Sequence, residues 1–221
     1  MRLARRHALA TLGLCAATLA THALAQSPPS GGDGEPITLV VLGDSLVAGY
    51  QLAPGDGFVP QLEAALEARG HDVDVVDAGV SGDTTSSGRA RLDWSVGEDA
   101  DAVVVELGAN DALRGLDPAT TRENLTAILD RLDERGLPVL LAGMLAPPNL
   151  GEEYGAAFTA VYEDLSRRNV VYYPFFLDGV AADPSLNLAD GIHPSAEGVA
   201  VIVRNILPEV EELIARARTA D

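Results

Sequence analysis

The sequence predicts an α/β fold in which a parallel sheet carries helices on both faces. Short runs of apolar, β-branched residues alternate along the chain with segments whose apolar residues recur at helical spacing. Most of the runs are nearly continuous in apolar character, which is typical of strands buried inside such a sheet. Ligands of parallel sheets bind beyond the carboxyl ends of the strands, so the residues that follow each strand are the first candidates for a site.

Nine elements follow from the two periodicities. The strands are expected at 37–42, 73–76, 102–107, 139–142 and 170–173. The helices are expected at 58–69, 118–134, 154–167 and 195–217. Gly70 should end the first helix, Asp117 and Ser195 should cap the second and the last, and Pro208 should kink the last.

The N-terminus predicts export. Three arginines precede a mostly apolar stretch, and Ala23-Leu24-Ala25 is a small-x-small cleavage site, so 1–25 is expected to be a signal peptide. An uncleaved N-terminal anchor is the alternative. We expect a flexible leader at 26–36, a single domain at 37–218 and a periplasmic or secreted location.

The composition excludes several classes of function. The formal charge is −18, and it becomes −21 without positions 1–25, which hold three arginines and no acidic residue. Such a charge disfavours nucleic acid and anionic lipid, so neither a nucleic-acid partner nor stable membrane insertion is expected. Cleavage would also remove Cys15, which is the single cysteine, and would leave His71 and His193 as the histidines. No metal-binding or phosphate-binding motif is present, and we expect no metal and no cofactor.

A serine and a histidine stand out as partners. Ser45 directly follows the first expected strand, and Asp190 stands three residues before His193. A serine becomes nucleophilic when a base takes its proton and a third group orients that base, and these residues supply all three parts. Each has a simpler interpretation as a turn or cap residue. His71 lies at the opposite end of the second strand, where a role in solvent is expected.

Acyl transfer also needs hydrogen-bond donors for an oxyanion. Gly82 lies in the glycine-containing loop after the second strand, Asn110 follows the third, and the backbone N–H of Ser45 is the natural third donor. Ordinary turn chemistry explains each loop by itself, because glycine and asparagine dominate turns. Together with the serine and the histidine, the three donors point to one site at one edge of the sheet.

The motifs resemble those of the SGNH (GDSL) hydrolase superfamily, in particular its bacterial periplasmic branch of thioesterase I, arylesterase and lysophospholipase L1. The resemblance rests on four blocks in order, at 41–46, 81–84, 106–111 and 190–195. It implies a three-layer α/β/α sandwich with a five-stranded parallel sheet of flavodoxin-like type. It also implies that Ser45 is the nucleophile, that Asp190 and His193 complete a triad, and that Gly82 and Asn110 join the Ser45 N–H as oxyanion donors.

Two regions depart from the family pattern. Asp77 stands where relatives often have asparagine, and because an ionised carboxylate cannot donate, the hydrogen bonding of that loop is expected to differ. The proline-rich and leucine-rich region 144–151 is expected to border an acyl pocket through Leu145 and Pro147. Three more apolar side chains are candidates for the same pocket, although packing in the core is the commoner fate of such residues: Leu113, Leu116 and Phe158.

The resemblance implies a secreted, cofactor-free serine hydrolase of the arylesterase, acyl-CoA thioesterase or lysophospholipase type, which works through an acyl-enzyme. Its partner would be a small acyl ester, thioester or lysophospholipid, and a monomer is expected. One alternative is a carbohydrate esterase that removes acetyl groups from cell-wall or plant polysaccharide. Another, from a different class, is a non-catalytic ligand-binding domain on the same scaffold.

Overall fold

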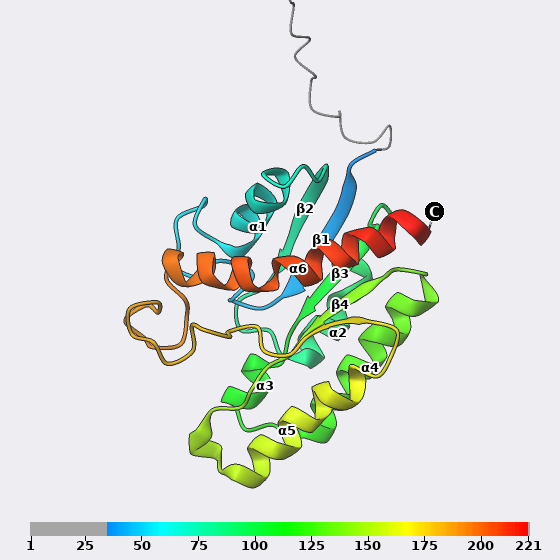
Figure 1. Cartoon of the computed structure of the whole chain (residues 1–221). Helices are drawn as coiled ribbons and strands as arrows, with labels where there is room; N and C mark the ends of the chain where they lie inside the picture. The colour runs from blue at the N-terminus through cyan, green and yellow to red at the C-terminus, as the bar shows by residue number, and fades with distance from the viewer. Residues whose placement is uncertain (1–34, 221) are drawn as a thin grey trace, which may run out of the picture. The chain divides into compact units, whose positions relative to one another are not determined.

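The computed structural model describes residues 35–220, and the expectations for positions 1–34 lie outside them. Its centre is one sheet of five parallel strands in the order β2-β1-β3-β4-β5 (Figure 1). The strands are β1 (Ile37–Gly43), β2 (Val73–Gly79), β3 (Ala102–Glu106), β4 (Val139–Ala142) and β5 (Val171–Tyr173). The prediction of a five-stranded parallel sheet is therefore confirmed.

Helices cover both faces of the sheet. They are α1 (Phe58–Glu67), α2 (Thr85–Ser95), α3 (Ala109–Leu113), α4 (Pro118–Glu134), α5 (Glu152–Leu165) and α6 (Ala196–Ala220), with a 3₁₀ turn, η1, at Pro148–Leu150. Helix α1 packs on α6, and α6 also contacts four of the strands. Helix α4 packs between α2 and α5 on the other side (Figure 1). These contacts give the expected three layers.

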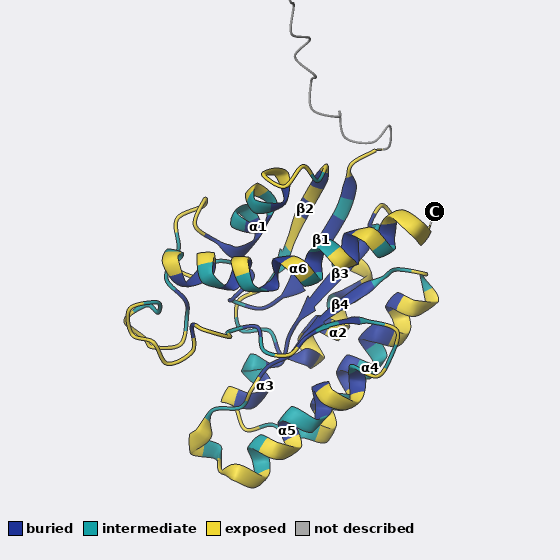
Figure 2. Ribbon diagram, in the orientation of Figure 1, coloured by how far each residue is buried: buried dark blue, intermediate teal, exposed yellow. Residues whose placement is uncertain are grey.

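The core lies on both sides of the central strands. Every residue of β3 is buried, whereas the edge strand β2 alternates between buried and exposed positions along its first four residues. The helices bury one side and expose the other, as the blue and yellow bands in Figure 2 show. The apolar residues whose periodicity predicted the helices are therefore the residues that face the core.

Two helices were missed in the sequence. Helix α2 buries Thr85, Gly88 and Leu92, so its inner face carries only one large apolar side chain and gives no apolar period. Gly88 is needed there because an added Cβ would lie 2.4 Å from Leu107 Cδ1. Helix α3 is a single short turn of five residues, which is too short for a periodic signal.

Other boundaries differ by a few residues. Strand β2 runs three residues beyond the predicted end and pairs with β1 as far as Gly79 opposite Gly43. Helix α6 continues through Pro208 as one helix, and the Ser195 hydroxyl accepts a hydrogen bond from the Gly198 N–H as a cap. Asp117 caps α4 by accepting from the N–H of Ala119.

The register of the central strands aligns their carboxyl ends. Gly43, the last residue of β1, lies opposite Gly79 of β2 and Glu106 of β3. The chain order reverses between β1 and β3, which is the topological switch point where parallel sheets bind ligands. The loops that hold Ser45 and Asn110 therefore leave the sheet side by side.

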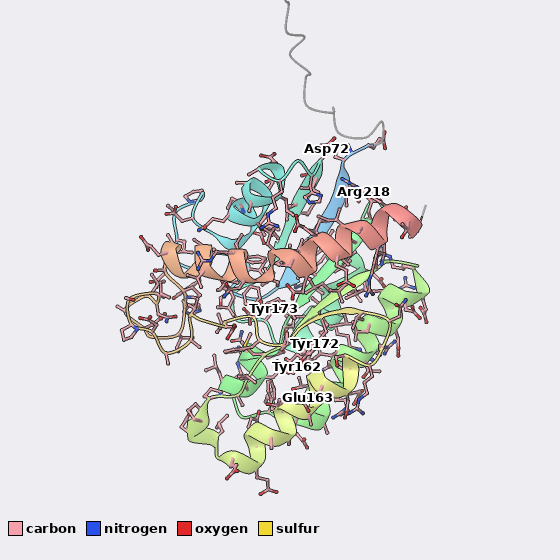
Figure 3. The ribbon with its side chains drawn as sticks, viewed as in Figure 1. Asp72, Tyr162, Glu163, Tyr172, Tyr173 and Arg218 are labelled. Carbon is pink, nitrogen blue, oxygen red and sulfur yellow. The ribbon has the colours of Figure 1, made fainter. Side chains whose placement is uncertain are left out.

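Close packing fixes the loop after β3. Gly108 has φ of 119°, and a Cβ at this position would lie 2.0 Å from the Tyr162 hydroxyl. That hydroxyl, on α5 (Figure 3), donates a hydrogen bond of 2.8 Å to the carbonyl of Leu107. Because only glycine has this backbone freedom and this small volume, the start of α3, and Asn110 with it, is held against α5.

Candidate active site

The structure brings Ser45, His193 and Asp190 together although they come from opposite ends of the domain. Ser45 Oγ lies 2.9 Å from His193 Nε2, and His193 Nδ1 lies 2.7 Å from Asp190 Oδ2. Both distances are within hydrogen-bonding range. With its Nδ1 proton donated to the carboxylate, the imidazole presents an unprotonated Nε2 to the serine hydroxyl, which is the arrangement that a general base requires.

A tight turn holds the Asp190 carboxylate in place. Its Oδ1 accepts the backbone N–H groups of Ile192 and His193 at 2.9 and 3.0 Å. Gly191 between them has φ of 69°, a left-handed conformation that glycine adopts freely. The hydrogen bonds from the His193 N–H, the Ile192 N–H and the imidazole lower the pKa of Asp190 to about 2. The carboxylate therefore stays charged beside the imidazole at any pH near neutrality.

Asp44, which precedes the serine, orients the side chain of Asn110. Its Oδ2 accepts a hydrogen bond of 2.9 Å from Asn110 Nδ2, and its Oδ1 accepts the Leu46 N–H at 3.0 Å. An amide nitrogen carries two protons, so Asn110 keeps one for another acceptor. Asn110 also lines the cavity beside Ser45, where that acceptor would lie.

A second carboxyl group, that of Glu106, lies close to Asp44. Glu106 closes β3, is fully buried, and its Oε2 is 3.4 Å from the Asp44 N–H. Burial raises the pKa of Glu106 well above its usual range, and the nearby Asp44 charge raises it further. Burial likewise raises the pKa of Asp44 to about 6, although its hydrogen bonds from Leu46 and Asn110 oppose the change. Burial thus favours the protonated form of Glu106 beside Asp44.

The loop of Gly82 reaches the same edge of the sheet. Gly82 has φ of 87°, and its carbonyl accepts a hydrogen bond of 2.8 Å from the Arg114 guanidinium. Within residues 35–220, the backbone N–H groups of Ser45 and Gly82 donate to no other protein group. Both donors are therefore free for a ligand atom.

A largely apolar cavity of about 640 Å³ opens beside Ser45 and His193. Loops after β1, β3, β4 and β5 form it, as expected for the carboxyl edge of a parallel sheet. The three side chains that the sequence predicted for substrate binding, Leu113, Leu145 and Pro147, line this cavity. Met144, the first residue of the predicted region 144–151, lines it as well. Further apolar residues in its wall were missed in the sequence: Leu46, Phe175, Leu177 and Ile192.

The other two pocket candidates lie elsewhere. Phe158 is fully buried and packs between Tyr154 and Tyr162, with ring centroids 6.0 and 5.6 Å away, so it belongs to the core. Leu116 does not line the cavity either, and its carbonyl accepts the Tyr154 hydroxyl at 2.7 Å.

One further expectation is corrected, and the structure adds detail to another. His71 does not simply face solvent, because its Nε2 lies 3.0 Å from Glu211 Oε1 on α6 and its side chain is half-buried. Asp77 lies inside β2, and its Oδ1 accepts the Gly79 N–H at 2.8 Å. A carboxylate can fill this role because the hydrogen bond needs an acceptor, and a difference from the bonding in relatives stays a prediction.

Two residues of the site, Glu106 and Tyr50, were missed in the sequence. Glu106 is the single charged residue in an otherwise apolar strand, and a lone carboxyl group in a buried strand is unusual enough to mark a site. Tyr50 gave no signal, although its ring centroid lies 4.5 Å from that of His193. That contact depends on the path of the loop after β1, which no periodicity describes.

The described residues hold no cluster of three or more histidine, cysteine or acidic side chains suited to a metal ion. No helix between residues 35 and 220 combines the length and the apolar character that crossing a bilayer requires.

Comparison with known proteins gives consistent matches over most of the chain. The model of the GDSL-like lipase/acylhydrolase family matches residues 41–201. Esterase TesA of Pseudomonas aeruginosa is 39% identical over 179 residues, which cover 80% of this chain and 89% of that protein. Thioesterase 1/protease 1/lysophospholipase L1 of Escherichia coli is 34% identical, with 80% and 85% covered. A crystal structure of TesA superposes with a TM-score of 0.76 at 39% identity, covering 80% of this chain and 99% of the other.

The buried Asp44 predicts an unusual dependence of stability on pH. Its folded pKa of about 6 lies above the ordinary 3.8, so the folded state binds a proton more tightly than the unfolded chain. Its contribution to stability is fully present below pH 3.8 and is lost as the pH rises through 6. A pKa difference of about two corresponds to about 3 kcal/mol.

We expect Asp44→Asn to remove this contribution. Urea denaturation at several pH values between 4 and 7 measures it as the slope of the unfolding free energy against pH. The wild type should gain stability as the pH falls through this range, whereas the variant should show a flatter curve. Parallel curves for the two proteins would contradict the assignment of the titration to Asp44.

Proposed function

The chain belongs to the GDSL-like lipase/acylhydrolase family, and we propose that it is a serine esterase that cleaves carboxylic ester and thioester bonds through an acyl-enzyme intermediate. The observation that carries this proposal is the chain of contacts from Ser45 Oγ through the His193 imidazole to Asp190, at 2.9 and 2.7 Å. A hydroxyl, a base and an orienting carboxylate in this order are what nucleophilic acyl transfer requires.

In the first half of the reaction, Ser45 Oγ attacks the carbonyl carbon while its proton passes to His193 Nε2. The Asp190 carboxylate stabilises the resulting imidazolium through Nδ1–H. When the tetrahedral intermediate collapses, the leaving alcohol or thiol takes the proton from Nε2 and the acyl group stays on the serine. Water then repeats the sequence with the same base and releases the carboxylic acid.

The negative charge on the carbonyl oxygen needs fixed donors. Three groups at the edge of the sheet can supply them: the Ser45 N–H, the Gly82 N–H and the free proton of Asn110 Nδ2. Removing one such donor typically lowers kcat about 100-fold to 1000-fold, because the charge exists only after attack. Asp44 acts on this step indirectly, since it holds the Asn110 amide.

The cavity favours substrates with a medium or long acyl chain. Its volume of about 640 Å³ exceeds what an acetyl group fills, and its wall is mostly apolar. The names of the relatives fit this range of substrates, because they include an esterase, an arylesterase and a thioesterase/lysophospholipase. Acyl esters, acyl thioesters and lysophospholipids are the proposed substrate classes.

A carbohydrate acetyl esterase would use the same groups and differ only in its substrate. Hydrolysis rates along a series of p-nitrophenyl esters from acetate to palmitate separate the two. A maximum at medium or long chains supports the acyl esterase, and a sharp preference for acetate supports the rival. A non-catalytic binding domain on this scaffold would hydrolyse none of the series.

The proposed setting is the periplasm or the outside of the cell. Residues 1–25 would direct export and be cleaved, residues 26–36 would form a leader, and residues 37–218 would act as a single catalytic domain, as a monomer and without a metal or cofactor. The signal cleavage site can be checked by N-terminal sequencing of the exported protein.

Substitution Ser45→Ala should abolish turnover of p-nitrophenyl butyrate while the thermal unfolding midpoint stays within a few degrees. The reason is that alanine removes the nucleophile and little else from a loop position. Steady-state kinetics and circular dichroism on the same preparation measure both quantities. Full activity in a folded Ser45→Ala protein would refute the assignment.

Asn110→Ala should lower kcat about 100-fold or more and change KM by less than about threefold. The lost hydrogen bond forms to the oxyanion and not to the ground-state carbonyl, so binding of the substrate is spared. Initial rates over a range of ester concentrations give both constants. An effect confined to KM would place Asn110 in substrate binding instead.

A further inference from the structure

Arg91 on α2 connects two of the loops that surround the site. Its Nε donates a hydrogen bond of 2.6 Å to Asp83 Oδ2, and its second terminal nitrogen, Nη2, donates to the Gly43 carbonyl at 2.9 Å. Its Nη1 donates to the Ser95 hydroxyl at 2.8 Å, which fixes the guanidinium to its own helix. All three nitrogens of the group are therefore engaged.

The two loop contacts lie next to the proposed oxyanion donors. Asp83 directly follows Gly82, and Gly43 stands two residues before Ser45. The guanidinium thus joins the segment that carries the Gly82 N–H to the segment that carries the Ser45 N–H. The same Gly43 carbonyl also accepts the Val80 N–H at 3.0 Å, so the link is a small network at the ends of β1 and β2.

Burial distinguishes this ion pair from the others in the described residues. The side chains of Arg91 and Asp83 are 15% and 13% exposed. Another pair that involves α2, Arg131 with Asp93, has a similar distance of 2.8 Å but exposures of 47% and 65%. Exposed pairs contribute little to stability because water screens them, whereas a buried guanidinium fork holds its partners in a fixed geometry.

We propose that Arg91 is a positioning residue that sets the separation of the Gly82 and Ser45 N–H groups, and that this separation controls kcat. The inference rests on the proposed function, because it assigns a cause to the geometry of the oxyanion donors. Such donors must be held within about 0.5 Å of the productive geometry. A planar group with three occupied nitrogens meets that requirement.

Arg91→Met tests the role while keeping a long unbranched side chain. We expect kcat for p-nitrophenyl butyrate to fall at least about tenfold, with KM within about twofold of the wild type. The matched control is Arg131→Met on α4, which breaks the exposed pair with Asp93 of α2 and should leave both constants unchanged. Unchanged kcat in a folded Arg91→Met protein would overturn the proposal.

A double variant separates positioning from stability. Arg91→Met alone leaves the Asp83 carboxylate buried without its partner, which destabilises the fold. Adding Asp83→Asn removes that charge, so the double variant should regain much of the lost thermal stability while kcat stays low. Recovery of kcat together with stability would mean that Arg91 has only a structural role. If Arg91→Met does not fold, the double variant and Arg91→Lys provide the same kinetic comparison.

The outcome for Arg91 can be told apart from the outcome for the whole mechanism. If the wild type hydrolyses the ester and Ser45→Ala does not, the proposed function stands, and the Arg91 variants then decide the positioning role alone. If Ser45→Ala keeps full activity, the serine mechanism fails, and the role of Arg91 in it fails as well.

Discussion

The contact between Ser45 and His193 joins residues 148 positions apart, and only the sheet can bring them within 2.9 Å. Parallel pairing of β1 with β2 and β3 sets Gly43 level with Gly79 and Glu106, so the loops that follow leave from one edge. The segment between β5 and α6 carries His193 to that edge. Helix α6 then packs against α1 and four of the strands. A shift in the register of β1 would move the hydroxyl away from the base and the oxyanion donors together.

The carboxyl groups of Asp190, Asp44 and Glu106 have different roles because their environments differ. Asp190 sits near the surface, where backbone N–H groups lower its pKa to about 2, so it remains a charge that can stabilise an imidazolium. Asp44 is buried and has its pKa raised to about 6, and burial also raises the pKa of the neighbouring Glu106. The first carboxylate faces the base. The second holds the amide of Asn110, and both roles are set by the loop and the strand end that carry them.

Much of this arrangement was predictable from the sequence. Strands buried on both faces have a simple apolar pattern, and glycines mark the loops that follow them. Ser45, Gly82 and Asn110 stood in such places, whereas Asp190 and His193 were found by their spacing of three residues beside Gly191 and Pro194. Helix α2 was not predictable, because its inner face is made of Thr85, Gly88 and a single leucine. The position of Arg91 on that helix was therefore not predictable either. Contacts of long side chains such as Arg91 and Tyr50 depend on how loops approach each other in space, and neither residue type nor spacing encodes that distance.

The central claim is that folding makes Ser45 uniquely reactive through His193. Peptide mapping by mass spectrometry after treatment with a fluorophosphonate tests it most directly. We expect one adduct, on Ser45, in the native wild-type protein, and only trace labelling in a folded His193→Ala variant. Modification of a different residue, or equally fast labelling of Ser45 without the imidazole, would contradict the account.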